Sequence, residues 1–267
     1  MLLSPEQILF YRTHGYLIVE AFLTESEILL YQDEAQQLTN HCYEQGDIVA
    51  NWGCVVEPLG CGYYDDDQVT QIAKSDRRSY IALRAQSAPL ALPLCTLDKF
   101  GLCARQLLHD KGDEQLTYLL NEQYIVKPPH STSAEFAWHQ DVLYFSESQR
   151  QHSVVSVWTP LSRVSAANGT VLVEPFPDHT SPGVYKDAPG GESSFAATME
   201  AGSALFMDGR LRHCSSGNQS ASFRLVYMPQ FSLGQIARDG DTHAALAIPL
   251  GPTTPLTSCL LDKVSPL

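Results

Sequence analysis

The stretch Trp138-His139-Gln140-Asp141 constrains the fold of this chain more than any other. If it forms a β-strand, the i, i+2 spacing puts the imidazole of His139 and the carboxylate of Asp141 on one face and turns Gln140 to the other. Two candidate metal ligands then point the same way. A third ligand must come from elsewhere, so the sequence predicts a fold that returns a distant segment to this strand.

His213 is the best candidate for the third ligand. It follows the strand-like run 203–207 and the turn residues Asp208-Gly209, and it lies 72 residues after Asp141 (213 minus 141). Short intervening strands can build a closed β-scaffold that brings the two segments together. Two histidines and one carboxylate on one face of an octahedron leave three positions open, the arrangement associated with non-heme Fe(II) oxygenases. Two open positions suit a 2-oxo acid, and the last suits O2.

The order of several further motifs is more specific than the triplet, which is common by chance in a chain of this length. The motifs are 3–7, 14–19 and 22–24, then Trp138-His139-Gln140-Asp141, 157–161 and 167–170, and finally 208–215 with Asn218, Ser220 and Arg224. In this order the chain resembles the phytanoyl-CoA dioxygenase family of Fe(II)/2-oxoglutarate oxygenases, and the resemblance covers most of its length.

The resemblance implies roles for individual residues. His139, Asp141 and His213 would bind iron, and Arg224 would pair with the distal carboxylate of 2-oxoglutarate. An arginine fork matches a carboxylate bidentately and stays protonated near neutrality, which supports the second assignment. The other residues that would contact the cosubstrate are Ser215, Trp158 and, as a weaker candidate, Gln123 on the expected strand 123–126.

Two of these residues also have ordinary structural interpretations. Arg224 lies in the alternating run 223–228, where it shares a face with Val226 and Met228. The alternative to a role in cosubstrate binding is an ordinary strand residue whose side chain faces solvent. Trp158 is equally compatible with a core position, because large aromatic residues fill barrel interiors. The segment 174–179 and the loop around Gly190-Gly191 depart from the family pattern, which leaves the shape of the substrate mouth open.

The composition fits a single enzyme domain spanning 1–267. Of its 267 residues, 44% are hydrophobic and 18% are charged, and β-barrel domains commonly reach this size undivided. The formal net charge of −13 disfavours nucleic acid and anionic membrane surfaces as partners. We therefore expect a small-molecule substrate. The sequence leaves a homodimer or a heterodimer open.

The seven cysteines, without a Cys-x-x-Cys pair, fit a reducing compartment better than a disulfide framework. The chain start lacks a long apolar signal region, and no stretch approaches the roughly 20 apolar residues that span a bilayer. The C-terminal Ser265-Pro266-Leu267 only faintly resembles a peroxisomal signal, because proline replaces the usual basic residue. We expect a cytoplasmic protein and leave a peroxisomal location open.

The expected fold is mainly β with flanking helices, a double-stranded β-helix or cupin-like jelly-roll with its core from about 120 to 235. Ser4 with Gln7, and Thr24 with Glu27, predict two capped helices, the second extending to about residue 40. Residues 15–19 predict a strand between them. Apolar residues at helical spacing predict a further helix over 94–108. These helices would buttress one sheet.

The sequence thus predicts an oxygenase that uses Fe(II), 2-oxoglutarate and O2 to oxidise a small organic molecule. Hydroxylation, desaturation or rearrangement is expected rather than halogenation, because the family's halogenases replace the carboxylate found here at Asp141. A hydrophobic secondary-metabolite intermediate is the favoured substrate, and acyl-CoA hydroxylation is the alternative. A non-catalytic partner subunit and a cupin-like isomerase are further alternatives; the isomerase has no need of Arg224.

Mobile loops at the barrel mouth are expected to set substrate selectivity. The candidate segments are 60–67 and 185–195, whose glycines give backbone freedom. Tyr63, Tyr64 and Phe195 would then cover the substrate as a lid.

Overall fold

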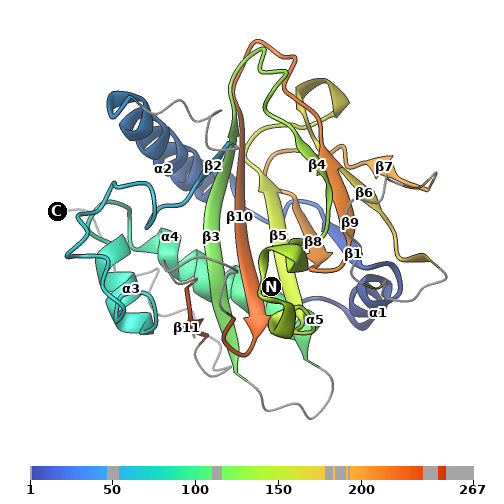
Figure 1. Cartoon of the computed structure of the whole chain (residues 1–267), viewed down its shortest axis with the longest axis horizontal. Helices are drawn as coiled ribbons and strands as arrows, with labels where there is room; N and C mark the ends of the chain where they lie inside the picture. The colour runs from blue at the N-terminus through green and yellow to red at the C-terminus, as the bar shows by residue number, and fades with distance from the viewer. Residues whose placement is uncertain are drawn as a thin grey trace.

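The computed structural model shows a β-core of two facing sheets with helices packed on one side (Figure 1). The residues it describes are 2–46, 54–109, 116–177, 183, 191, 193–236 and 246–250. The predicted jelly-roll with flanking helices is confirmed by this arrangement of antiparallel sheets.

Within the described residues, the larger sheet has seven strands in the order β1-β8-β5-β10-β3-β11, with β2 paired to β3. Their bounds are Tyr16–Val19 (β1), Val55–Val56 (β2), Thr117–Lys127 (β3), Val154–Pro160 (β5), Ala204–Asp208 (β8), Arg224–Leu233 (β10) and Ile248–Pro249 (β11). The long strands β3, β5 and β10 lie side by side at the centre (Figure 1). Most of their residues are buried, because both faces of this sheet are covered.

The smaller sheet has four described strands in the order β4-β9-β6-β7. Their bounds are Phe136–His139 (β4), Val171–Glu174 (β6), Phe195–Ala196 (β7) and Arg212–Ser215 (β9). An apolar cluster fills the space between the two sheets, with Trp158 and Met228 from the larger sheet and Val171 and Val173 from the smaller one. The functional side chains lie in this inter-sheet layer.

The N-terminal helices form as their capping residues predict. Ser4 and Gln7 make the capping box of α1 (Pro5–His14), and Thr24 and Glu27 make that of α2 (Glu25–Glu44). The second helix continues past residue 40, because Cys42 still packs in the core. Gly15 ends α1 at φ 77°, and a Cβ there would lie 2.4 Å from the ring of Phe176, so glycine is required.

The remaining helices of the described chain lie between residues 77 and 108. They are α3 (Arg77–Arg84), α4 (Ala91–Leu94), a π-helical turn (Cys95–Phe100) and α5 (Gly101–Leu108). The predicted helix over 94–108 is confirmed, and its apolar side chains pack on the larger sheet together with α2. Short 3-10 turns follow the strands at Asp141–Tyr144, Glu147–Gln149 and Ala166–Asn168.

A buried ion cluster joins the helical layer to the larger sheet. Arg84 of α3 forms ion pairs with Glu34 of α2 and, at 3.0 Å, with Glu122 of β3. The side chain of Arg84 is fully buried. Tyr124 donates a hydrogen bond to Glu34, while Tyr80 donates one to Glu122 at 2.6 Å. Such a cluster is costly to break, since removing one partner leaves an uncompensated buried charge. Glu122 occupies the strand position between Asn121 and Gln123, on the opposite face.

Candidate metal centre and its cavity

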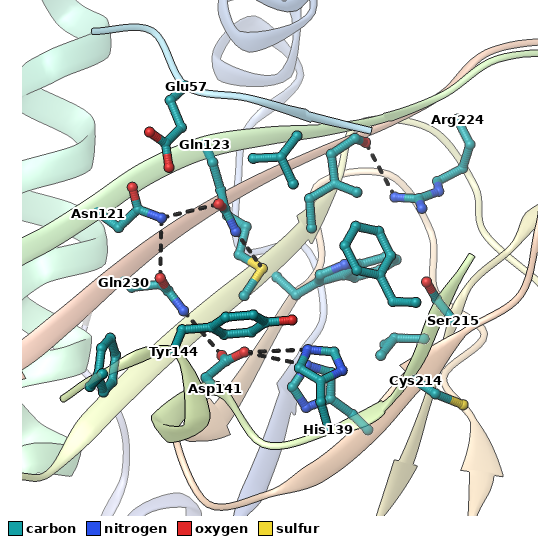
Figure 2. Close-up of a pocket in the computed structure, with 18 residues that line it drawn as sticks. Glu57, Asn121, Gln123, His139, Asp141, Tyr144, Cys214, Ser215, Arg224 and Gln230 are labelled. Atoms are coloured by element: carbon teal, nitrogen blue, oxygen red, sulfur yellow. Dashed lines mark hydrogen bonds and ion pairs between the residues drawn. The ribbon is translucent and has the colours of Figure 1, made fainter. Parts of the chain in front are cut away.

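The β4–β9 pairing brings the three predicted metal ligands together. His139 and His213 are direct partners in this register. Asp141 was predicted on the same strand, but it begins the following 3-10 turn instead. Because Gln140 stays extended (φ −123°, ψ 136°), the carboxylate of Asp141 still lies beside the histidines. Oδ1 of Asp141 lies 3.7 Å from Nε2 of His139 and 3.6 Å from Nε2 of His213. Figure 2 shows His139 pointing towards Asp141. One atom from each side chain lies within 4.8 Å of the others, which fits a single metal ion.

Backbone carbonyls fix the tautomer of both histidines. Nδ1 of His139 lies 2.8 Å from the carbonyl oxygen of Ala137, and Nδ1 of His213 lies 3.0 Å from that of Leu211. Because a carbonyl oxygen only accepts, each Nδ1 carries the proton and each Nε2 keeps a lone pair for a metal. Burial, and then the neighbouring His139, lower the pKa of His213 to about 4. The ring is therefore neutral at pH 7, as a ligand must be.

Gln140 points away from the site, as predicted. Its side chain is 1% exposed, and Nε2 donates to the carbonyl oxygens of Gly183 at 3.0 Å and Arg210 at 2.7 Å. The bond to Arg210 ties the turn that carries Asp141 to the β8–β9 connection, and the bond to Gly183 ties it to the segment between β6 and β7. The triplet thus has two functions, since its outer members face the cavity and its middle member anchors it.

A cavity of about 380 Å³ opens beside the three ligands, and Arg224 lines its far end (Figure 2). The guanidinium is 1% exposed and lies 5.5 Å above the ring of Trp158. It makes one hydrogen bond, to the carbonyl oxygen of Ile125 at 3.3 Å, and its Nε has no acceptor among the described residues. Burial lowers its pKa to about 9, which still leaves it charged at neutral pH. Such a buried cation favours an anionic ligand.

A second basic side chain, that of Lys127, lies behind Ser215 at the same end. It is the register partner of Arg224, and its Nζ donates to Oγ of Ser215 at 2.7 Å. Burial, followed by the nearby Arg224, lowers the pKa of Lys127 to about 7. Because the oxygen of Ser215 is the acceptor in this bond, its hydroxyl hydrogen is left to point elsewhere. The sequence analysis missed Lys127, although antiparallel pairing of 117–127 with the strand of Arg224 would have placed it there.

The structure places the other predicted cosubstrate residues on the same cavity. Gln123 and Trp158 both line it, together with Ser215. Arg224 shares a face with Val226 and Met228, as the alternation indicated, and this face is buried, so the solvent-facing interpretation is excluded.

The three predicted lid residues do not line this cavity, which corrects their predicted placement. Tyr64 is buried in the helical layer, where its hydroxyl contacts Ser87 and Arg84. Tyr63 packs beside it, and Phe195 stacks on Tyr16 with ring centroids 5.3 Å apart. Tyr64 is therefore part of a small buried cluster, whereas Tyr63 and Phe195 are half-buried against the edges of apolar clusters. Most of the second candidate loop, 185–195, lies outside the described residues.

The cavity is instead lined by polar residues that the sequence analysis did not single out. They are Glu57, Asn121, Tyr144 and Gln230, with Ser156 behind them against Asp141. Tyr144 is 56% exposed, and its ring centroid lies 5.6 Å from that of His139, so it marks the mouth. Its position three residues after Asp141, on the same short turn, was the available signal.

Comparison with known proteins agrees with this geometry. The model of the phytanoyl-CoA dioxygenase family matches residues 11–226 of the chain. The chain belongs to this family. The peroxisomal phytanoyl-CoA dioxygenases of Bos taurus and Homo sapiens are each 24% identical to it, over 251 and 250 residues. In both cases the match covers 86% of this chain and 68% of the relative.

Solved structures share the fold of this family member at low sequence identity. The non-heme alpha ketoglutarate dependent carbocyclase SnoK from nogalamycin biosynthesis has a TM-score of 0.62 at 18% identity, covering 93% of this chain and 94% of that one. The epimerase SnoN, in complex with Fe3+, alpha ketoglutarate and nogalamycin RO, has a TM-score of 0.60 at 17% identity, covering 93% and 95%. Among the described helices, none has the length and apolar character needed to cross a membrane.

Proposed function

We propose that this protein is an Fe(II)- and 2-oxoglutarate-dependent oxygenase that oxidises a small, mainly apolar organic molecule. The observation that carries the proposal is the pairing of two sites within one cavity. A cluster of two neutral histidines and a carboxylate lies at one end, and the buried guanidinium of Arg224 lies at the other. Membership of the phytanoyl-CoA dioxygenase family and the likeness to SnoN support the same chemistry.

The residues present fit both the metal and the cosubstrate. Two imidazoles and one carboxylate are the ligand types of the facial triad, and the cavity beside them leaves room for further ligands. When bound, iron and 2-oxoglutarate supply the O2 activation that yields succinate and CO2 and removes a hydrogen atom from the substrate.

The side chains of the cavity would bind and orient 2-oxoglutarate and keep water away from it. Arg224 would hold the distal carboxylate of 2-oxoglutarate by charge-assisted hydrogen bonds, and its burial strengthens them because little water competes. Ser215 would donate to the same carboxylate, because its oxygen already accepts from Lys127 and its hydroxyl hydrogen is left for another acceptor. Trp158 covers the guanidinium on one side. These groups orient the 2-oxo end towards the histidines.

The substrate class follows from the rest of the lining. Among the described residues, the rest of the cavity lining is mostly apolar or uncharged, including Val55, Ile125, Phe136 and Met228. Arg224, the cation in the described lining, lies at the cosubstrate end. A hydrophobic secondary-metabolite intermediate therefore fits better than a multiply charged ligand.

Acyl-CoA hydroxylation is the second candidate, since the curated relatives are named phytanoyl-CoA dioxygenases. Tight binding of coenzyme A phosphates would favour basic residues along the cavity, whereas the described lining contains the acidic Glu57 and, apart from Arg224, neither lysine nor arginine. Intact ligand residues disfavour a non-catalytic subunit, and the buried Arg224 disfavours an isomerase without 2-oxoglutarate. The cysteine content supports a cytoplasmic location, because free cysteines suit a reducing compartment.

An anaerobic titration tests the proposal. Fe(II) and 2-oxoglutarate added together should produce the weak visible charge-transfer band of the chelate, and neither should produce it alone. Aerobically, the loaded protein should form succinate slowly even without a substrate. Absence of both the band and the succinate would overturn the assignment.

Tyr144→Ala should impair handling of the substrate while leaving the cosubstrate site intact. The phenol ring stands at the mouth, 56% exposed, and away from Arg224. Once a substrate is identified, we expect a raised substrate KM and a lower product yield per succinate, with 2-oxoglutarate affinity unchanged. Tyr144→Phe separates the ring from its hydroxyl group. An unchanged KM in the alanine variant would assign the mouth to other residues.

A further inference from the structure

One oxygen of Asp141 is held by two donors from the larger sheet. Ser156 Oγ donates a short hydrogen bond to Oδ2, and Gln230 Nε2 donates to the same atom at 3.1 Å. Gln230 Nε2 also lies 2.9 Å from Ser156 Oγ, which closes a triangle of polar groups. Ser156 is fully buried and Gln230 is 7% exposed. Little water can therefore replace these donors.

The charge of Asp141 sets the direction of a longer amide chain (Figure 2). A carboxylate only accepts, so Gln230 must present its Nε2 to Asp141, and its Oε1 is left to accept from Asn121 Nδ2 at 3.2 Å. Asn121 Nδ2 also donates to Gln123 Oε1 at 3.0 Å. Each amide orientation is thus determined by the previous one, beginning at the carboxylate.

The sheet register holds these groups in a row. Gln230 on β10 is the direct partner of Ser156 on β5 and of Asn121 on β3. A bulge follows at Gln230/Phe231, and bulges commonly re-aim side chains beside active sites. The row therefore belongs to the rigid centre of the larger sheet, whereas Asp141 lies on a short turn outside it.

We propose that Ser156 and Gln230 are positioning residues that restrict Asp141 to one metal-binding oxygen. This inference rests on the proposed function. Two donors occupy Oδ2, while Oδ1 faces the Nε2 atoms of His139 and His213 at 3.7 and 3.6 Å. A carboxylate that bound through both oxygens would take an additional coordination position. The sheet thereby keeps that position open for the cosubstrate and O2.

Metal binding, rather than turnover, tests the inference. Ser156→Ala and Gln230→Met each remove one donor, and Mn(II) serves as an O2-stable probe whose free concentration is measured by electron paramagnetic resonance. We expect each variant to bind Mn(II) about tenfold to a hundredfold more weakly, as is typical for the loss of a group that orients a metal ligand. The number of waters on bound Mn(II), measured by proton relaxation, should fall as Asp141 becomes free to bind through both oxygens.

Ser232→Ala is the matched control. It removes a buried serine from the same strand as Gln230, and its Oγ bonds to the carbonyl oxygen of Gly234 instead of the site. Wild-type affinity and hydration in both test variants, at the level of this control, would overturn the inference while leaving the proposed function intact. Failure of the wild-type protein to bind Mn(II) would overturn both. The two donors are removed in separate variants. If one variant does not fold, the Mn(II) affinity and hydration of the other variant test the inference.

Discussion

Replacing His139, Asp141 or His213 with alanine should abolish turnover and leave the fold largely intact. Each residue is one of three side chains that meet at the candidate metal position, whereas the core is built from apolar residues of two sheets and the helices. Loss of a group that merely orients a ligand costs about 10–100-fold in metal affinity, so loss of a ligand should cost more. Succinate formation measures turnover, isothermal titration with Mn(II) measures metal affinity, and a thermal unfolding curve measures the stability of the fold.

The matched control for this experiment is His152→Ala. His152 is not among the described residues that line the cavity. Its Nδ1 lies 3.3 Å from the carbonyl oxygen of Leu233 instead. This variant should bind metal like the wild-type protein. Near wild-type turnover in any one ligand variant would remove that residue from the metal centre.

Arg224→Met should change stability and cosubstrate binding in opposite directions. In the ligand-free protein the guanidinium is buried with one hydrogen bond, so replacing it with an apolar side chain should raise the free energy of unfolding by about 1–3 kcal/mol. The same variant loses a charge-assisted contact to 2-oxoglutarate, which costs about 1.5–3 kcal/mol, or roughly tenfold to a hundredfold in affinity. Unfolding curves with and without 2-oxoglutarate reveal both effects.

Arg163→Met serves as the control, because this arginine has a side chain that is 72% exposed and pairs with Glu200 at the surface. It should leave both quantities unchanged. Unaltered 2-oxoglutarate affinity in Arg224→Met would mean that another group, with Lys127 first in line, holds the distal carboxylate.

The parts of the fold that local chemistry determines were predictable from the sequence. Capping boxes at Ser4 and Thr24 predicted both N-terminal helices, and the alternation around Arg224 predicted a strand on which Arg224 shares a face with Val226 and Met228. The His139 and His213 segments were predicted to meet because a metal site requires it. Spacing alone could not show that Asp141 lies on a turn, since an extended Gln140 delivers the carboxylate to the same place.

The residues that escaped prediction depend on contacts between distant strands. Gln230 and Ser156 are 74 positions apart and meet only through the β5–β10 register, which is regular, whereas the bulge at Gln230/Phe231 lies in the pairing of β10 with β3. Tyr63 and Tyr64 were misplaced for a related reason. Aromatic residues beside glycines suit a lid as well as a core, and only the packing of the helical layer distinguishes the two.

The ion cluster of Arg84, Glu34 and Glu122 has a consequence for exchanging parts between family members. It joins α2 and α3 to β3, the strand that also carries Asn121 and Gln123 of the cavity. A chimera that imports foreign N-terminal helices without their own β3 would bring together charges that did not evolve as a set, at a buried position where a missing partner costs about 3–5 kcal/mol. Helices and β3 should therefore be transferred as one block, whereas the 3-10 turn bearing Tyr144 lies outside this cluster and offers a separate site for altering substrate choice.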